Sequence, residues 1–180
     1  MKQLTLKLKN GQMQVLEVPP PALRPGIILV RNHYSLISPG TEGSTVSTAR
    51  KSLVGKARDR RQQVRQVVNM ALQQGLAQAY RTIMKKLDAY SSLGYSSAGE
   101  VVDVASDVKE FCVGDLVACG GGGYASHAEV VAVPQNLCVR LPLVNNKECG
   151  VQDIQDRMKR AAYNTLGAIA LQGVRQADLK

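Results

Sequence analysis

The amino-acid sequence predicts a mainly β protein with helices, in which closely spaced strands form a small antiparallel barrel or a bent sheet. The main observation is residues 93–142, where β-branched residues occur in short runs separated by Gly, Asp and Pro. This pattern is typical of strands and turns. Residues 44–90 and 153–176 have helical periodicity instead. We therefore expect a β-rich body with a helical insertion and a C-terminal helix.

The composition indicates a globular protein. The 180 residues are 44% hydrophobic and 21% charged, which suits a chain that buries a core and is not disordered. Such a length fits one domain, or one domain with an appendage. No apolar run reaches the roughly 18 residues of a membrane span, and the first ten residues do not resemble a signal peptide. We therefore predict a cytoplasmic protein with no membrane partner.

The first part of the chain predicts a hairpin, a strand and a loop. Apolar and polar residues alternate on both sides of Asn10-Gly11, which is the strongest short signal for a β-hairpin. Prolines at positions 19–21 end the second strand. Residues 27–31 predict a buried strand, and residues 34–41 predict a loop of small polar side chains.

The insertion at residues 44–90 predicts a helical hairpin. Apolar residues recur at helical spacing before and after Gly75, which fits a helix stop. We expect the apolar stripe of this hairpin to pack against another surface. The recurring residues are Val64, Val67, Val68, Ala71 and Leu72, then Leu76, Ala79, Tyr80, Ile83, Met84 and Leu87.

The net charge of +9 is concentrated in the same insertion. Residues 50–88 contain ten Lys or Arg and two acidic residues, a net +8. A solvated face would explain this charge. A site for an anion would explain it too, such as a nucleotide-activated or carboxylated sugar, or the acidic face of another domain. Nucleic acid is a further alternative on charge alone, but no recognised nucleic-acid motif accompanies the charge, so we do not expect nucleic acid as the partner.

Neither the glycine run nor the cysteines predict a cofactor site. Residues 120–123 are four consecutive glycines, but a strand-like segment follows them, whereas a phosphate-binding loop opens a helix. The four cysteines form no C-x-x-C pair, and their spacings of 7, 19 and 11 are poor for zinc. We expect ordinary reduced thiols at Cys112, Cys119, Cys138 and Cys149.

Three runs of the sequence resemble a known family. LGYSSAGEVV from Leu93 is followed by V-x-x-F-x-x-G-D-x-V from Val108 to Val117, and YASHAE with a later Val-Pro begins at Tyr124. This order is similar to the GroES-like domain of the medium-chain dehydrogenase/reductase superfamily, where the first run is usually G-H-E-x-x-G-x-V. The resemblance implies a partly open β-barrel over residues 1–150. It also implies a connecting helix over 151–180 toward a Rossmann domain that binds NAD(P) beyond Lys180, so that the chain is a truncated part of the enzyme.

The resemblance also implies an enzyme that works without zinc. In zinc-dependent relatives a cysteine and the His and Glu of G-H-E bind or neighbour the metal. Ser38, Tyr95 and Ser96 stand at these positions, and the third ligand would fall near Thr165. None of these residues is a zinc ligand of the required type.

A substrate carbonyl would then be polarised by hydrogen bonds. By position, the catalytic candidates are Ser38, Thr41 and Tyr95, with Tyr95 as a proton donor, and Glu42 and Ser96 would line the substrate cleft. Two alternatives stay open. Thr41 and Glu42 could cap the following helix, and Tyr95 could be a packing residue with its hydroxyl in solvent.

The helical insertion is similar to that of a subgroup of bi-domain oxidoreductases from bacterial polysaccharide and sugar-modifying pathways. We therefore expect an NAD(P)-dependent, zinc-independent oxidoreductase domain, inactive on its own, for an alcohol, carbonyl or sugar-type substrate. Homo-oligomers are compatible with this expectation. The alternative is a GroES-like binding or assembly module whose basic insertion docks an anionic partner.

Overall fold

The computed structural model describes residues 1–52, 55, 58, 61–142 and 151–177. It divides into two compact units, each of which is described by itself. We name them the sheet unit, which comprises Met1–Leu4, Leu16–Ile37 and Ser92–Lys180, and the helical unit, which comprises Thr5–Val15 and Ser38–Ser91. The predicted domain boundary at residue 150 lies outside the described residues.

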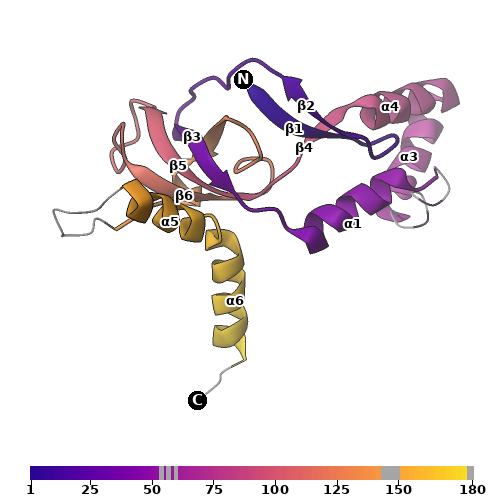
Figure 1. Ribbon diagram of the computed structural model, residues 1–180. Coiled ribbons are helices and arrows are strands. Elements are labelled where there is room, and N and C mark those ends of the chain that lie inside the picture. Colours follow the sequence, from indigo (N-terminus) through magenta and orange to yellow (C-terminus); the bar gives the residue numbers. More distant parts are fainter. Residues whose placement is uncertain (53–54, 56–57, 59–60, 143–150, 178–180) are drawn as a thin grey trace. The chain divides into compact units, whose positions relative to one another are not determined.

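The elements are drawn in Figure 1. The strands are β1 (Lys2–Lys7), β2 (Met13–Glu17), β3 (Ile27–Ser35), β4 (Tyr90–Ser92), β5 (Ser96–Val104), β6 (Leu116–Gly120), β7 (Val130–Pro134) and β8 (Cys138–Arg140). The helices are α1 (Pro39–Arg50), α3 (Arg61–Gln74), α4 (Leu76–Asp88), α5 (Val151–Ala161) and α6 (Asn164–Gln176), with a 3-10 turn η1 (Gln135–Leu137).

A five-stranded sheet forms the body of the sheet unit. Its order is β7-β3-β5-β6-β8, and neighbouring strands are antiparallel. The β3–β5 register shifts between Leu29 and Val30 and again between Asn32 and Tyr34, and such bulges bend a strand. The sheet is curled (Figure 1), which confirms the predicted partly open barrel. A second sheet has the order β2-β1-β4, and its β1–β2 neighbours confirm the predicted hairpin.

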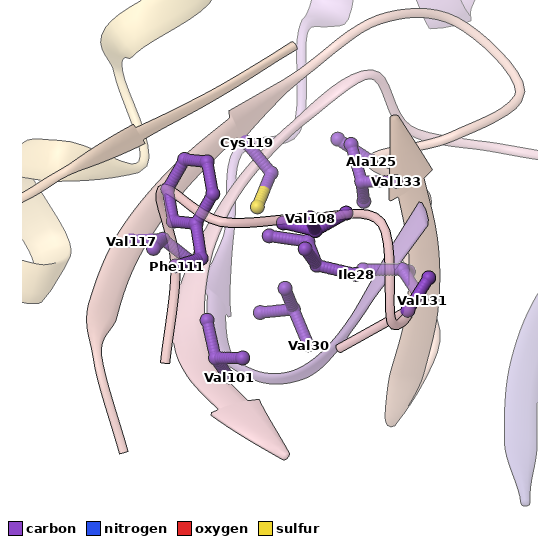
Figure 2. Packing of buried hydrophobic residues seen from close by; sticks show 11 residues of the cluster. Ile28, Val30, Val101, Val108, Phe111, Val117, Cys119, Ala125, Val131 and Val133 are labelled. Atoms are coloured by element: carbon purple, nitrogen blue, oxygen red, sulfur yellow. The ribbon is translucent and has the colours of Figure 1, made fainter. Parts of the chain in front are cut away.

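The core fills the concave side of the curled sheet, where branched side chains from four strands meet (Figure 2). Alternate residues of a strand point to the same face, so Ile28 and Val30 enter the core together from β3. The loop between β5 and β6 closes the core with Val108 and with Phe111, the single Phe of the chain. The remaining members are Val101, Ala105, Val117, Cys119, Ala125, Val131 and Val133.

The centre of the sheet depends on a close approach of backbones at Gly99. A Cβ atom at this position would lie 2.1 Å from the carbonyl oxygen of Arg31 and 2.7 Å from a methyl group of Val30. No side chain fits at such distances, so the β3–β5 pairing requires glycine here. This explains physically why a glycine stands in the run that begins at Leu93.

Two sequence predictions were wrong in their boundaries. The predicted loop at residues 34–41 is much shorter, because β3 continues to Ser35 by pairing with Ser97 and α1 begins at Pro39. The single helix predicted for residues 153–176 is two helices, α5 and α6, separated around Tyr163. The contacts of Asn164, described below, account for this break.

The helical unit confirms the predicted hairpin. Gly75, at φ +88°, separates α3 from α4, and the two helices pack side by side (Figure 1). The predicted insertion begins inside α1, which starts five residues before position 44. The prediction that its apolar stripe is packed was only partly right, because Val68, Leu72 and Leu76 are exposed. Among the described helices, none combines the length and apolar character needed to cross a membrane.

Candidate functional site

The five predicted site residues fall in two units. Ser38, Thr41 and Glu42 stand at the start of α1 in the helical unit, whereas Tyr95 and Ser96 belong to the sheet unit. These residues therefore form two separate groups, one in each unit. Each group has a geometry of its own, and the roles predicted for these residues stay predictions.

Ser38 and Glu42 bind each other across the first turn of α1. Ser38 is the N-cap, and its hydroxyl oxygen accepts a hydrogen bond from the Thr41 backbone N–H at 3.5 Å. In return the Glu42 carboxylate accepts from the Ser38 N–H at 3.2 Å. This reciprocal arrangement resembles a capping box, and a carboxylate near a helix N-terminus also favours the helix dipole. Capping is therefore the observed role of this group, with Ser38 as the cap, and the Thr41 side chain remains exposed.

The second group joins three of the positions that the family resemblance matches to zinc ligands. Tyr95 directly precedes β5, Ser96 is its first residue, and Thr165 lies in the first turn of α6. The Thr165 hydroxyl donates to the Tyr95 carbonyl at 3.2 Å, and the Thr165 N–H donates to the Ser96 hydroxyl oxygen at 3.3 Å. These positions are therefore adjacent although 70 residues separate Tyr95 from Thr165 in the chain.

Ser96 and Tyr95 differ in how accessible they are. Ser96 is fully buried, and its hydroxyl donates a 2.7 Å hydrogen bond to the Ala162 carbonyl. Its observed contacts hold the α5–α6 junction, and a role in a substrate cleft stays a prediction. Tyr95 is half-buried. Of this pair, Tyr95 is therefore the better placed to reach a ligand.

Asn164 is the residue that the sequence analysis missed. Its side-chain amide nitrogen lies 3.0 Å from the Cys119 carbonyl, 3.1 Å from the Ala161 carbonyl and 3.3 Å from both the Ser97 carbonyl and the Ser96 hydroxyl. Asn side chains bind nearby backbone groups and so favour helix ends over helix interiors. An Asn in the middle of the predicted 153–176 helix was therefore an available signal for a break.

Gly120 makes room for this polar group. A Cβ atom at Gly120 would lie 3.0 Å from the Thr165 hydroxyl and 3.4 Å from the Asn164 side-chain oxygen. Either contact is tighter than ordinary van der Waals packing. The glycine at the end of β6 thus lets α6 approach the sheet.

The described residues do not fit a dinucleotide cofactor. The glycine run 120–123 turns tightly, with Gly121 at φ +109° and Gly123 at φ +84°. It leads into the loop before β7 and opens no helix, so it lacks the helix N-terminus that binds pyrophosphate. Metal ligands are not clustered either: in the described ranges no three or more His, Cys, Asp or Glu could share an ion.

Two of the cysteines lie against each other inside the sheet unit. The sulfur atoms of Cys119 and Cys138 are 3.7 Å apart on the paired strands β6 and β8. The contact with Cys138 and burial of the side chain together raise the pKa of Cys119 well above its usual range. Cys112 is exposed, and Cys149 lies outside the described residues.

Comparison with known proteins identifies the type of domain. Residues 62–143 match the alcohol dehydrogenase GroES-like domain family. No curated protein sequence matches the chain.

Solved structures share the fold. The quinone oxidoreductase of Coxiella burnetii matches with a TM-score of 0.63 and 21% identity over 100% of this chain and 46% of its own. The 2R,3R-butanediol dehydrogenase of Bacillus subtilis matches with a TM-score of 0.58 and 16% identity, over 99% and 48%. The Escherichia coli quinone oxidoreductase in complex with NADPH matches with a TM-score of 0.50 and 18% identity, over 79% and 33%. The chain thus spans less than half the length of each.

The described part of the chain therefore has the fold of the matching part of these solved structures. The match over residues 62–143 confirms the predicted resemblance to the alcohol dehydrogenase GroES-like domain for that part of the chain.

Proposed function

We propose that this chain is the substrate-side domain of an NAD(P)-dependent oxidoreductase that polarises its substrate by hydrogen bonds and not by zinc. The observation that carries the proposal is the adjacency of Tyr95, Ser96 and Thr165 at the positions that match zinc ligands in relatives. Their side chains offer hydroxyl groups, whereas zinc sites are built from Cys, His and carboxylate ligands.

In this proposal Tyr95 donates a hydrogen bond, and finally a proton, to the substrate oxygen. Thr165 fixes the Tyr95 backbone through its bond to the Tyr95 carbonyl, and Ser96 anchors the adjacent helix junction. Ser38 and Thr41 are further candidates for substrate contacts at the start of α1. The substrate would be an alcohol, a carbonyl compound or a sugar derivative. NAD(P), when bound, would supply or accept the hydride. The described residues do not fit NAD(P), so binding of this cofactor would require a separate domain.

The test uses the complete product of the native gene. NADPH oxidation would be followed with quinones, enones, aldehydes and nucleotide-activated sugars. We expect Tyr95→Phe to lower kcat by about 10²-fold or more with little change in KM, as for loss of a general acid. Tyr90→Phe is the matched control, because Tyr90 is an exposed tyrosine in β4. A chelator should leave the rate unchanged. Full activity of Tyr95→Phe, or loss on chelation with recovery on adding zinc, would overturn the proposal.

The isolated chain of 180 residues provides a second check. We expect it to bind NADPH with a Kd above about 10 μM, because its glycine run offers no helix N-terminus to the pyrophosphate. Isothermal titration calorimetry would measure this Kd directly. A much lower Kd would contradict the proposal that a separate domain binds the cofactor.

A further inference from the structure

The net charge of the protein lies entirely in the helical unit. This unit contains twelve Lys or Arg and three acidic residues, a net +9, whereas the sheet unit contains eleven of each. The two described acids are already included in this net charge: Glu42 is buried, and Asp88 lies 3.2 Å from Lys9. A separation of this size between two units of one chain indicates a surface for a polyanion.

The same unit exposes apolar side chains in a regular stripe. Val64, Val68 and Leu72 recur every four residues and so share one face of α3. Leu76 and Tyr80 continue the exposed set on α4. Leu72 and Leu76 are 81% and 80% exposed on either side of the Gly75 turn, so the two leucines stand at the tip of the hairpin.

Cationic side chains lie next to this apolar stripe. Arg65 is exposed and stands three residues before Val68 and seven before Leu72, which places it on the same face of α3. Arg81, also exposed, directly follows Tyr80 on α4. Arginine can lay its aliphatic stem along apolar surface while its charged group reaches outward. An apolar stripe bordered by Arg and Lys is the pattern of helices that lie on membrane surfaces.

We propose that the α3–α4 hairpin docks on a membrane surface rich in anionic phospholipids. Leu72, Leu76 and Tyr80 enter the boundary between headgroups and acyl chains, and Arg65 and Arg81 bind lipid phosphates. This mode needs no membrane-spanning helix, so it is compatible with the described helices, none of which could cross a membrane. It is independent of the oxidoreductase proposal.

The charge argues against other occupants. A second copy of the chain would bring one +9 surface against another, which repels. Nucleic acid would neutralise the arginines but leave Leu72 and Leu76 in water. An anionic bilayer satisfies both features at once.

The first experiment is cosedimentation of the 180-residue chain with vesicles. We expect binding to phosphatidylcholine vesicles that contain about 30% phosphatidylglycerol, and none to phosphatidylcholine alone, with binding weakened by salt. Arg65→Gln should weaken binding about five-fold, and Leu72→Ser with Leu76→Ser about ten-fold. The controls are on α6 of the sheet unit, where Arg175→Gln changes an exposed arginine and the pair Leu166→Ser with Ile169→Ser changes apolar side chains that are 37% and 61% exposed.

A fluorescence experiment locates the contact. The chain contains no Trp, so Tyr80→Trp introduces a single reporter on α4 and Tyr163→Trp a matched one in the sheet unit, at 64% and 58% native exposure. Anionic vesicles should shift the emission of Trp to the blue at position 80 and leave position 163 unchanged.

Three results would overturn the proposal. The first is absence of binding to anionic vesicles at low salt. The second is binding that the leucine pair does not affect and that heparin or DNA reproduces, which would indicate a general polyanion surface. The third is a blue shift at position 163 in place of position 80.

Discussion

The hydroxyl of Ser96 on β5 donates a 2.7 Å hydrogen bond to the carbonyl of Ala162, the residue that directly follows α5. Both residues are buried. Together with the Thr165–Tyr95 contact, this bond ties the α5–α6 junction to the first residues of β5. We therefore expect a substitution that loosens the α5–α6 junction to change the position of Tyr95, although the junction and Tyr95 are far apart in the sequence.

Asn164→Ala should destabilise the protein by about 1–3 kcal/mol, because it leaves partly buried carbonyl groups without their side-chain donor. Urea unfolding would measure the free energy of unfolding. Gln172→Ala, an exposed change on the same helix, is the control and should be within about 0.5 kcal/mol of the parent. Equal stability of the two variants would show that the Asn164 contacts contribute nothing.

Gly99→Ala should destabilise the protein more than the addition of a single methyl group would suggest. The new Cβ would lie 2.1 Å from the Arg31 carbonyl oxygen, so the two central strands must separate, at a cost of about 3 kcal/mol or more. Gly122→Ala is the matched control, because a Cβ there meets nothing within 4 Å. Thermal unfolding followed by circular dichroism would rank the two variants, and similar midpoints would contradict this account of the β3–β5 pairing.

The parts of the fold that depend on local pattern could be predicted from the sequence. Gly75 between two apolar periodicities marked the α3–α4 hairpin, and alternating residues around Asn10-Gly11 marked the first hairpin. The only local signal for the break between α5 and α6 was Asn164 itself, whereas its contact with the Cys119 carbonyl, 45 residues away, required the structure. The adjacency of Tyr95 and Thr165 likewise required the structure, since the family resemblance only suggested that both positions match zinc ligands of relatives.

The described cysteines should differ sharply in reactivity. The contact with Cys138 and burial raise the pKa of Cys119, so it stays a protonated thiol at neutral pH, and the thiol form is a poor nucleophile. Exposed Cys112 should react with iodoacetamide at pH 8 about 100-fold faster or more. Peptide mass spectrometry at short times gives both rates. The difference should vanish in urea, and Cys119 labelling at the Cys112 rate in the folded protein would refute its assigned environment.

Capping and catalysis by Ser38 can be separated by substitution. Ser38→Ala removes the acceptor for the Thr41 N–H and should cost about 1 kcal/mol of stability. Ser38→Asn keeps a capping oxygen and should restore most of that loss. Ser44→Ala on the exposed part of α1 is the control and should not destabilise, because alanine favours the helix interior.

Urea unfolding of these variants measures the contribution of Ser38 to capping. NADPH-dependent turnover by the complete gene product measures its contribution to catalysis. If Ser38 only caps α1, Ser38→Asn recovers both stability and turnover. If its hydroxyl also contacts the substrate, Ser38→Asn recovers stability alone, because an amide at this position has a different length and cannot replace the hydroxyl at the reacting oxygen. A Ser38→Ala variant as stable as the parent would show that the observed cap does not stabilise α1.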